Sequence, residues 1–491
     1  MQRSLPILVA ALAFALVPAL APAAARASAA QESIFQEDDL LLRTDASGRE
    51  ATLDQLQALG VDTIHTLVGW AALAPDPTSK TRPHFDGFDP ADYPADGFAA
   101  YDGLLRSAQR RGMQVIFTVS GFVPAWASNC GGPVSVRRTC KPDAGAFRSF
   151  VAMLGRRYSG SYDPGDGQGP LPRVDRWSIW NEPNQSGWLY PQQVRHGSSV
   201  IPFAPILYRK MVQGATSALD ATGHGSDQIL LGETAPLGRT TGSLGKRSLA
   251  PMDFLRETFC LDRHWRPYRG RDARLRHCSS RERLDVNGLA HHPYTRAASR
   301  DPRASIGRGD ITVSTLSRLR LAADRAARQR VVPRGVPLYL TELGFQTDPP
   351  DRLAGTSLSR QAKWLNYSEF QAYRQSRVAG IAQYQLRDEP NLAGFQTGLQ
   401  YKDGSAKPAL EAYRLPIWVT RSGSRVRVWG RVRGAAAGDS ADVQYRVGSE
   451  WVTSATLQTN ERGFVDALLP AHSVWRLMHG DQVSRTGRIE R

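Results

Sequence analysis

Strand-like and helix-like patterns alternate regularly between about residues 36 and 415, and this alternation constrains the fold more than any other feature of the sequence. Runs that match strands occur at 33–42, 62–70, 113–120, 174–180, 228–231, 284–290, 336–341 and 378–385. Runs that match helices occur at 52–60, where Thr52 is the expected N-cap, and at 100–112, 144–158, 206–221, 252–260, 313–328, 360–376 and 407–413. Such alternation implies a parallel sheet with right-handed crossovers.

The number of repeats indicates how the sheet closes. Eight repeats without a glycine-rich phosphate turn after the first strand favour an α/β fold of the (β/α)8 TIM-barrel type over a doubly wound sheet. We expect this barrel over residues 31–415. After residue 415 the sequence changes to short alternating stretches, such as 425–432 and 451–457, which predict a small antiparallel β-sandwich domain over 416–491.

The N-terminal segment is typical of a secretory signal peptide over residues 1–29. Arg3 is followed by an apolar run over 5–16 and then by the small residues Ala27-Ser28-Ala29. A single membrane anchor is the alternative, and Pro18 and Pro22 count against it because they interrupt the apolar stretch. We therefore expect a secreted or otherwise extracytoplasmic protein without stable membrane insertion.

The four cysteines agree with export. Two local disulfides, Cys130–Cys140 and Cys260–Cys278, are the simplest of the three possible pairings. Each would stabilise the fold by roughly 3 kcal/mol if it acts on the entropy of the unfolded chain. The spacings match no zinc motif, so we expect no metal site.

The charge balance suggests an anionic partner without identifying one. The chain has 62 basic and 46 acidic residues, a formal net charge of +16. The basic residues are mostly scattered arginines, and the sequence shows neither a basic tail nor a nucleic-acid-binding motif. We therefore expect no nucleic-acid partner and interpret the charge as an arginine-rich surface.

Two glutamates follow expected strands at the end of the barrel where active sites form. Glu182 lies in the sequence Trp-Asn-Glu-Pro-Asn at 180–184, and Glu342 lies in Thr-Glu-Leu-Gly-Phe at 341–345. Glu342 alone is explained as well by a helix cap or a surface ion pair, whereas Glu182 lies in a strand end that combines an aromatic residue, an amide, an acid and a proline. Two carboxyl groups across one barrel mouth, however, are what cleavage of a glycosidic bond requires. Glu233, after the fifth strand, is an alternative carboxylate that no flanking motif supports.

These two motifs resemble the clan-A glycoside hydrolases, the retaining barrel enzymes that include cellulases, mannanases and β-xylosidases. The resemblance covers about residues 33–415. It implies that Glu182 is the general acid/base, that Glu342 is the nucleophile and that Asn181 hydrogen-bonds the sugar 2-hydroxyl. The same resemblance implies a carbohydrate substrate, a poly- or oligosaccharide, and no cofactor.

Other strand ends agree with this resemblance. His292 and Tyr294 match the family's H-x-Y pattern after the sixth strand. Tyr294 would donate a hydrogen bond to Glu342. His292 would contact the substrate, or alternatively it is a buried histidine with a structural role. Trp126 and Trp70, after the third and second strands, are interpreted either as stacking surfaces for sugars or as packing at the barrel rim. Many family members have a tryptophan after the eighth strand, whereas this chain has Tyr384 and Gln385.

The predicted function is secreted retaining hydrolysis of O-glycosidic bonds, with carboxyl groups about 5–5.5 Å apart. Two alternatives remain open: an envelope transglycosidase that uses the same residues, and a non-catalytic glycan-binding barrel.

The second domain contains four tryptophans, which either form its core or stack on glycan. They are Trp418, Trp429, Trp451 and Trp475.

Overall fold

The computed structural model describes residues 28–278, 283–296 and 300–490. The predicted signal peptide at 1–29 lies outside the described residues except for its last two positions. No described helix combines the length and the apolar character that a membrane crossing needs.

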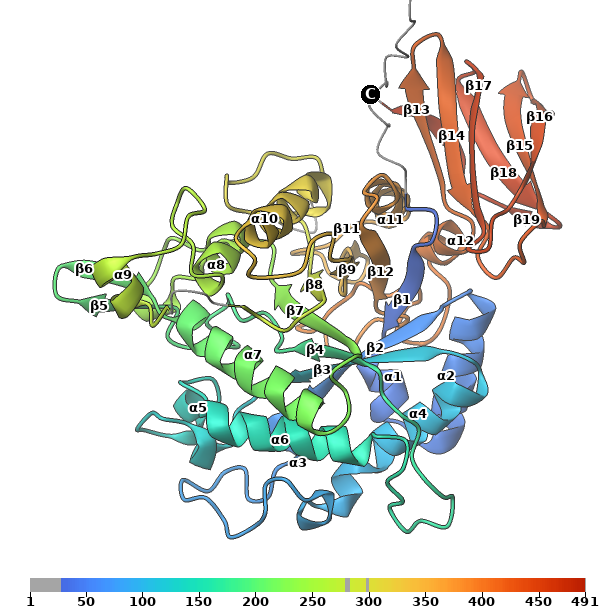
Figure 1. The fold of residues 1–491 in the computed structure, drawn as a ribbon. Coiled ribbons are helices and arrows are strands. Elements are labelled where there is room, and N and C mark those ends of the chain that lie inside the picture. The colour runs from blue at the N-terminus through green and yellow to red at the C-terminus, as the bar shows by residue number, and fades with distance from the viewer. Residues whose placement is uncertain (1–27, 279–282, 297–299, 491) are drawn as a thin grey trace, which may run out of the picture.

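Eight parallel strands form a closed barrel, as the alternation predicts (Figure 1). Around the barrel the order is β1, β2, β3, β4, β7, β8, β9 and β12, so each strand pairs with its neighbours in the chain and β12 closes against β1. The strands are β1 (Glu32–Gln36), β2 (Thr63–Gly69), β3 (Gln114–Ser120), β4 (Arg176–Ile179), β7 (Gln228–Thr234), β8 (Gly288–His291), β9 (Leu338–Leu340) and β12 (Val378–Tyr384).

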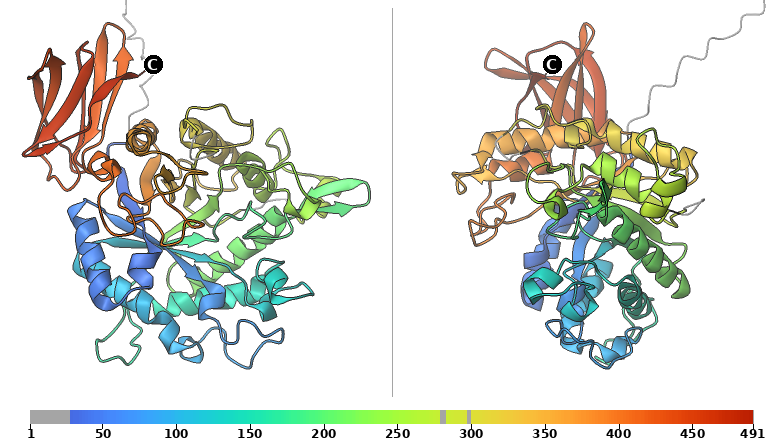
Figure 2. Two further views of the ribbon diagram at one scale, coloured as in Figure 1. Left: turned by 180° about the vertical axis from the view of Figure 1, so that it is seen from behind. Right: turned by 90° about the vertical axis from the view of Figure 1, so that its left-hand side faces the viewer.

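Helices surround the barrel and connect its strands (Figures 1 and 2). The helices that match expected positions are α2 (Ala46–Ala58), α4 (Ala99–Arg110), α6 (Ala144–Arg157), α7 (Ala204–Ala221), α8 (Pro251–Thr258), α10 (Ser317–Arg328), α11 (Leu358–Tyr373) and α12 (Pro408–Arg414). Shorter helices lie in the loops: α1 (Asp38–Leu42), α3 (Trp70–Leu73), α5 (Val134–Arg137) and α9 (Gly270–Leu275).

Several expected boundaries are wrong, and three of them have a clear structural description. The first strand ends at Gln36 rather than residue 42, because Glu37 accepts a hydrogen bond from the Leu40 backbone and caps α1. Helix α2 begins before Thr52, since Asp45 caps it by accepting from the Gly48 backbone. The sixth strand is shorter than the expected 284–290 and runs from Gly288 to His291.

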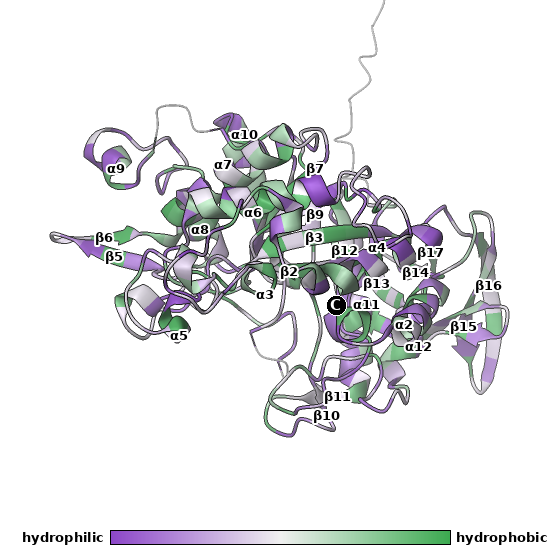
Figure 3. Cartoon of the chain, turned by 90° about the horizontal axis from the view of Figure 1, so that it is seen from below, coloured by the Kyte–Doolittle hydropathy of each residue, from purple (hydrophilic) through white to green (hydrophobic). Residues whose placement is uncertain are grey.

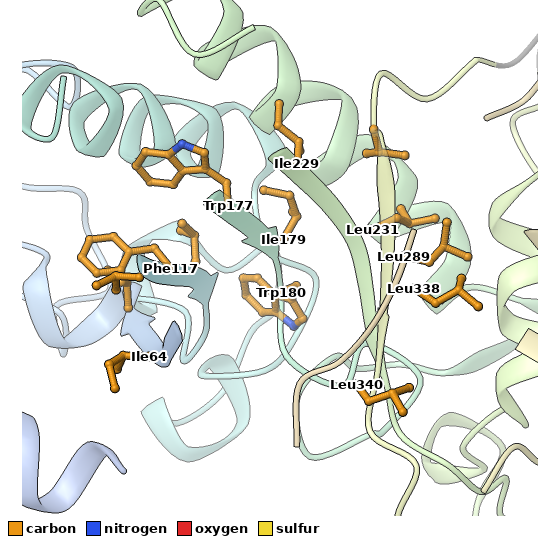
Figure 4. Close-up of a cluster of buried hydrophobic side chains, with 14 of the residues drawn as sticks. Ile64, Phe117, Trp177, Ile179, Trp180, Ile229, Leu231, Leu289, Leu338 and Leu340 are labelled. Atoms are coloured by element: carbon orange, nitrogen blue, oxygen red, sulfur yellow. The ribbon is translucent and has the colours of Figure 1, made fainter. Parts of the chain in front are cut away.

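The barrel strands have two apolar faces, which explains their nearly continuous hydrophobic sequences. Outward-facing side chains pack against the helices in the main core, among them Phe117, Ile179 and Leu231 (Figure 4). A separate cluster fills the interior and consists of Ile34, Ile116, Leu230, Ala290, Tyr339 and Ala382. Coloured by hydropathy, the barrel strand β3 is mainly apolar and the surrounding helices mix polar and apolar residues (Figure 3).

Both expected disulfides are present in the loops. Cys130 pairs with Cys140, and Cys260 pairs with Cys278. The loops also carry two small two-stranded sheets, one made of β5 (Gln193–His196) and β6 (Ser199–Pro202), the other of β10 (Thr347–Asp348) and β11 (Thr356–Ser357).

The C-terminal part is a mostly antiparallel sheet of eight strands. They are β13 (Ile417–Ser422), β14 (Arg425–Arg431), β15 (Ser440–Val447), β16 (Glu450–Gln458), β17 (Phe464–Pro470), β18 (Val474–His479), β19 (Gln482–Val483) and β20 (Gly487–Glu490). The two halves of the expected sandwich are joined through β20, which pairs parallel with β13 and antiparallel with β18. An apolar core lies inside the sheet.

This sheet is docked on α11 and α12 of the barrel (Figure 2). Trp418 and Trp429 contact the aromatic side chains of α11, with ring centroids 5.2 Å from Tyr367 and 5.6 Å from Phe370. Arg433 and Glu369 form a buried ion pair of 2.8 Å across the same interface. Since Trp475 is also buried, Trp451 is the one tryptophan of this sheet that keeps appreciable exposure among the described residues.

Candidate active site

Glu182 and Glu342 meet at the C-terminal end of the barrel. Glu182 follows β4 and Glu342 follows β9, and both carboxyl groups contact one imidazole nitrogen. His292 Nδ1 lies 3.2 Å from Glu182 Oε1 and 3.3 Å from Glu342 Oε2. These two carboxyl oxygens are therefore at most about 6.5 Å apart, the sum of 3.2 and 3.3 Å. That limit lies at the lower end of the range typical of inverting glycosidases and is compatible with the shorter spacing of retaining ones.

The carboxyl pair lies in a site with little solvent. The Glu182 and Glu342 side chains are 21% and 13% exposed. Burial raises the pKa of Glu342 to about 7; the His292 charge opposes this rise and the Glu182 charge adds to it. Two carboxyls this close share their protons, so the pair as a unit keeps one proton up to about neutral pH.

A hydrogen bond distinguishes the two carboxyls. The Tyr294 hydroxyl donates to Glu342 Oε2 over 3.1 Å. Burial and the nearby Glu342 charge raise the pKa of Tyr294 well above its ordinary value, so this phenol remains a donor. A donated hydrogen bond favours the ionised form of a carboxyl group, so this contact favours ionisation of Glu342 and opposes the effect of burial.

Other residues predicted for the site take different positions. Asn181 is buried, with its backbone nitrogen donating to Ser120 Oγ over 3.0 Å and its side-chain oxygen without a protein partner. Tyr384 ends β12, and burial, followed by the Glu342 charge, raises the pKa of its phenol. Its ring meets the half-exposed Phe395 edge to face, at 5.3 Å between centroids.

The two tryptophans near the second and third strands take part in packing. Trp70 is fully buried, and its ring stacks on Phe150 at 5.9 Å between centroids. Trp126 meets Trp70 edge to face and donates its indole hydrogen to the Pro75 carbonyl over 2.9 Å. For Trp70 the structure therefore shows the packing role, with no face left for a sugar.

The polar residues after β12 pair with one another or with neighbours. Asp388 forms a buried ion pair of 2.6 Å with Lys407, and Glu389 accepts a hydrogen bond from the Gln385 amide over 3.2 Å. Arg387 Nε donates to Gln400 Oε1 over 3.3 Å. Each of these three rim side chains therefore pairs with a neighbouring residue of the protein.

A second layer of the site contains His65, which sequence reasoning missed, and Glu233, which it named only as an alternative carboxylate. His65 on β2 and Glu233 on β7 are fully buried beneath the carboxyl pair and lie 3.0 Å apart, between His65 Nε2 and Glu233 Oε1. His292 Nε2 lies 3.5 Å from the other oxygen of Glu233. His291, the neighbour of His292, points elsewhere and contacts Thr234 Oγ1 and the Ile311 carbonyl. One signal was available for His65, a histidine inside a strand whose other residues are apolar or threonine.

Within the three described ranges, no cluster of three histidine, cysteine, aspartate or glutamate side chains has the arrangement of a metal site.

Comparison with known proteins identifies the fold. No protein-family profile matches the sequence, and no curated protein is similar to it. Among solved structures, a family 39 glycoside hydrolase from the gut symbiont Bacteroides cellulosilyticus WH2 is similar over 90% of this chain and 81% of its own, at 12% identity and a TM-score of 0.50. This chain shares that enzyme's fold.

Two further structures are similar at lower scores. A glucosidase from Croceicoccus marinus matches 90% of this chain and 82% of its own, at 14% identity and a TM-score of 0.48. The β-glycosidase of the hyperthermophile Thermosphaera aggregans matches 74% of this chain and 83% of its own, at 17% identity and a TM-score of 0.46. At these identities the likeness concerns the fold, and the chemistry has to be argued from the site.

Proposed function

We propose that this chain is an exported retaining glycoside hydrolase that cleaves O-glycosidic bonds of a poly- or oligosaccharide. The observation that carries the proposal is the placement of Glu182 and Glu342 on one histidine at the mouth of the barrel. The fold it shares with a glycoside hydrolase supports the same conclusion. Two disulfides support export, because such bonds persist in oxidising compartments.

The mechanism assigns one role to each carboxyl. Glu342, ionised by the Tyr294 hydrogen bond, attacks the anomeric carbon while Glu182 gives its proton to the departing oxygen. The bond between the anomeric carbon and the leaving group breaks, and a bond to Glu342 forms. Glu182, now a carboxylate, then removes a proton from water, which attacks the same carbon and releases Glu342 with the sugar configuration retained.

The decisive test compares the wild type with Glu182→Ala and Glu342→Ala on a panel of β-glycans and aryl glycosides. We expect both variants to lose reducing-sugar release by a factor of about 10³ or more. Azide should restore turnover in each: Glu182→Ala should give a glycosyl azide of retained configuration, and Glu342→Ala one of inverted configuration. Glu257→Gln, which removes a buried carboxylate from α8, is the matched control and should keep its activity.

Three outcomes would change the proposal. Full activity in either alanine variant would move the catalytic role to another carboxylate. Products extended by an added sugar acceptor, with little hydrolysis, would identify a transglycosidase that uses the same residues. Wild-type protein that binds glycans and cleaves none of them would identify a binding protein on a barrel scaffold.

A further inference from the structure

A row of buried polar side chains continues from the carboxyl pair into the barrel. Glu233 lies between two histidines, with Oε2 3.5 Å from His292 Nε2 and Oε1 3.0 Å from His65 Nε2. Thr118 donates its hydroxyl hydrogen to Glu233 Oε1 over 2.8 Å. The side chains of His65, Glu233 and His292 are 0% exposed. A buried charge is tolerated only when it is paired, so the protonation states of these groups must agree with one another.

The neighbours of His65 define its protonation state. Gln36 directs its amide nitrogen toward Asp38 Oδ2 at 3.4 Å, which leaves its oxygen facing His65 Nδ1 at 2.8 Å. That oxygen only accepts, so Nδ1 carries a hydrogen. On the other side, Nε2 lies 2.7 Å from Thr118 Oγ1, whose own hydrogen points to Glu233. Nε2 therefore meets only lone pairs and carries a hydrogen too, which makes His65 an imidazolium.

The same reasoning applies to His292. Its Nδ1 faces oxygens of Glu182 and Glu342, and its Nε2 faces an oxygen of Glu233. Burial lowers the pKa of His292, but the Glu342 charge, hydrogen bonds to Glu182 and Glu233 and the Glu233 charge outweigh burial and raise that pKa well above the ordinary value. For Glu233, burial raises the pKa, and the two histidine cations more than offset it and hold that pKa low.

We propose that Glu233 is a positioning residue that, together with His65, keeps His292 cationic and fixed between the two carboxyls of the active site. Two imidazoliums and one carboxylate leave a single positive charge, which balances the single negative charge of a pair that shares one proton. Without Glu233, two buried cations would face one anion, and a histidine would release its proton. The inference rests on the proposed function only for the catalytic role of that pair.

The charged and titratable groups around this row come from six barrel strands, or the loops after them, and from one helix. Around His292 and Glu233 they are Asp38 after β1, His65 on β2, Glu182 after β4, His291 and Tyr294 at β8, Glu342 after β9, Tyr384 on β12 and Tyr208 of α7. Burial lowers the pKa of His291 to about 3, so this histidine adds no charge.

The first experiment needs no substrate. Protein labelled with ¹⁵N in its histidine side chains is titrated between pH 5.5 and 8, and the signals of His65 and His292 are assigned with His65→Gln and His292→Gln. In the wild type we expect both rings to show two protonated nitrogens across this range. The Glu233→Gln side chain keeps a similar size and an oxygen for Thr118. In this variant we expect one of the two histidine rings to lose a proton during the titration, with a midpoint below pH 7.

The second experiment follows activity. Loss of the His292 cation removes the charge that lowers the pKa of Glu342, so the nucleophile is ionised only at higher pH. In Glu233→Gln the acid limb of kcat/KM should therefore move up by about one pH unit or more. We expect kcat to fall about 10–100-fold while KM changes less, because the carboxyls are misplaced rather than lost. Glu233→Asp, which restores the charge, should return the acid limb toward its wild-type position.

Each result decides the inference. A neutral His292 ring in the wild type at pH 6 would overturn it, as would a folded Glu233→Gln variant whose histidine signals and pH profile match the wild type. If Glu233→Gln does not fold, the wild-type titration decides. Glu257→Gln should leave both readouts unchanged. Failure of the proposed function would appear separately, as wild-type protein without glycosidase activity but with the expected histidine signals.

Discussion

Glu182 lies in a turn whose backbone conformation is unusual for its residues. Trp180 and Glu182 have φ angles of 70° and 39°, in the left-handed region that non-glycine residues seldom adopt. Such conformations cost of order 1–3 kcal/mol each and persist where neighbours impose them. Here the end of β7 does so, because the Glu182 nitrogen donates to the Glu233 carbonyl and the Glu233 nitrogen donates to the Trp180 carbonyl.

The raised pKa of Glu342 predicts a pH profile. The proposed mechanism needs this carboxyl ionised, because it attacks the anomeric carbon. Burial raises the pKa of Glu342 to about 7, so the ionised form becomes the main one only above that pH. The acid limb of kcat/KM should therefore lie near pH 7, as measured by initial rates on an aryl glycoside. Constant activity from pH 6 to pH 9 would contradict this prediction.

Tyr294→Phe tests the hydrogen bond to Glu342, the proposed nucleophile. Its loss removes a donor to a charged acceptor, worth about 1.5–3 kcal/mol, so kcat/KM should fall about 10–100-fold. The acid limb should move to higher pH, since the ionised Glu342 loses stabilisation. Tyr339→Phe is the matched control, because that hydroxyl lies inside the barrel and faces Gln228. Equal effects of the two changes would show that Tyr294 acts only through packing.

Much of the site could be predicted because it depends on strand ends. Glu182, Glu342, His292 and Tyr294 follow parallel strands, and the barrel brings all such positions to one mouth. Glu233 could not be placed in this way. In a regular strand the Glu233 side chain would point outward, on the same face as Leu231. It points into the barrel because the strand register shifts between Leu231 and Thr234, and no sequence pattern predicts that shift.

At the level of elements, the register shift in β7 depends on Gly232. Its φ is +127°, and a Cβ there would lie 2.1 Å from the Ala290 carbonyl oxygen. Gly232→Ala should therefore destabilise the fold by about 3 kcal/mol or more, from strain and overpacking together. Thermal unfolding measures the loss, with Gly112→Ala as the comparison, since that glycine also has a positive φ but open space around it. A smaller effect at Gly232 than at Gly112 would contradict the prediction.

Element existence was predictable, and boundaries were not. The eight strands and their helices follow from long hydrophobic patterns, to which many residues contribute. The ends depend on single contacts: the Glu37 side chain stops β1, and it also accepts from the Leu386 and Arg387 backbones after β12. Contacts between residues this far apart in sequence leave no local signal.

For the whole molecule, the C-terminal sheet and the barrel form a continuous structure. The Arg433–Glu369 pair is 1% and 8% exposed. Glu369→Ala would leave the Arg433 cation buried without its partner, at a cost of about 3–5 kcal/mol. We expect a single calorimetric unfolding transition in the wild type and in Glu369→Ala, with the transition temperature of the variant several degrees lower. Glu411→Ala, which removes an exposed pair with Arg414, should change stability by less than about 1 kcal/mol. Two separate transitions in the wild type would show that the sheet unfolds independently.

The docked sheet also brings late residues of the chain to early ones. Arg433 donates to Ser33 Oγ on β1, and Arg462 pairs with Asp62 before β2 over 2.6 Å, both across 400 residues of sequence. A ribosome adds about 5–20 residues per second. The partners of Ser33 and Asp62 are therefore synthesised roughly 20–80 s after these two residues. Throughout that interval the first strands of the nascent protein stay incompletely buried. Resistance to protease should therefore appear only after synthesis of the final sheet.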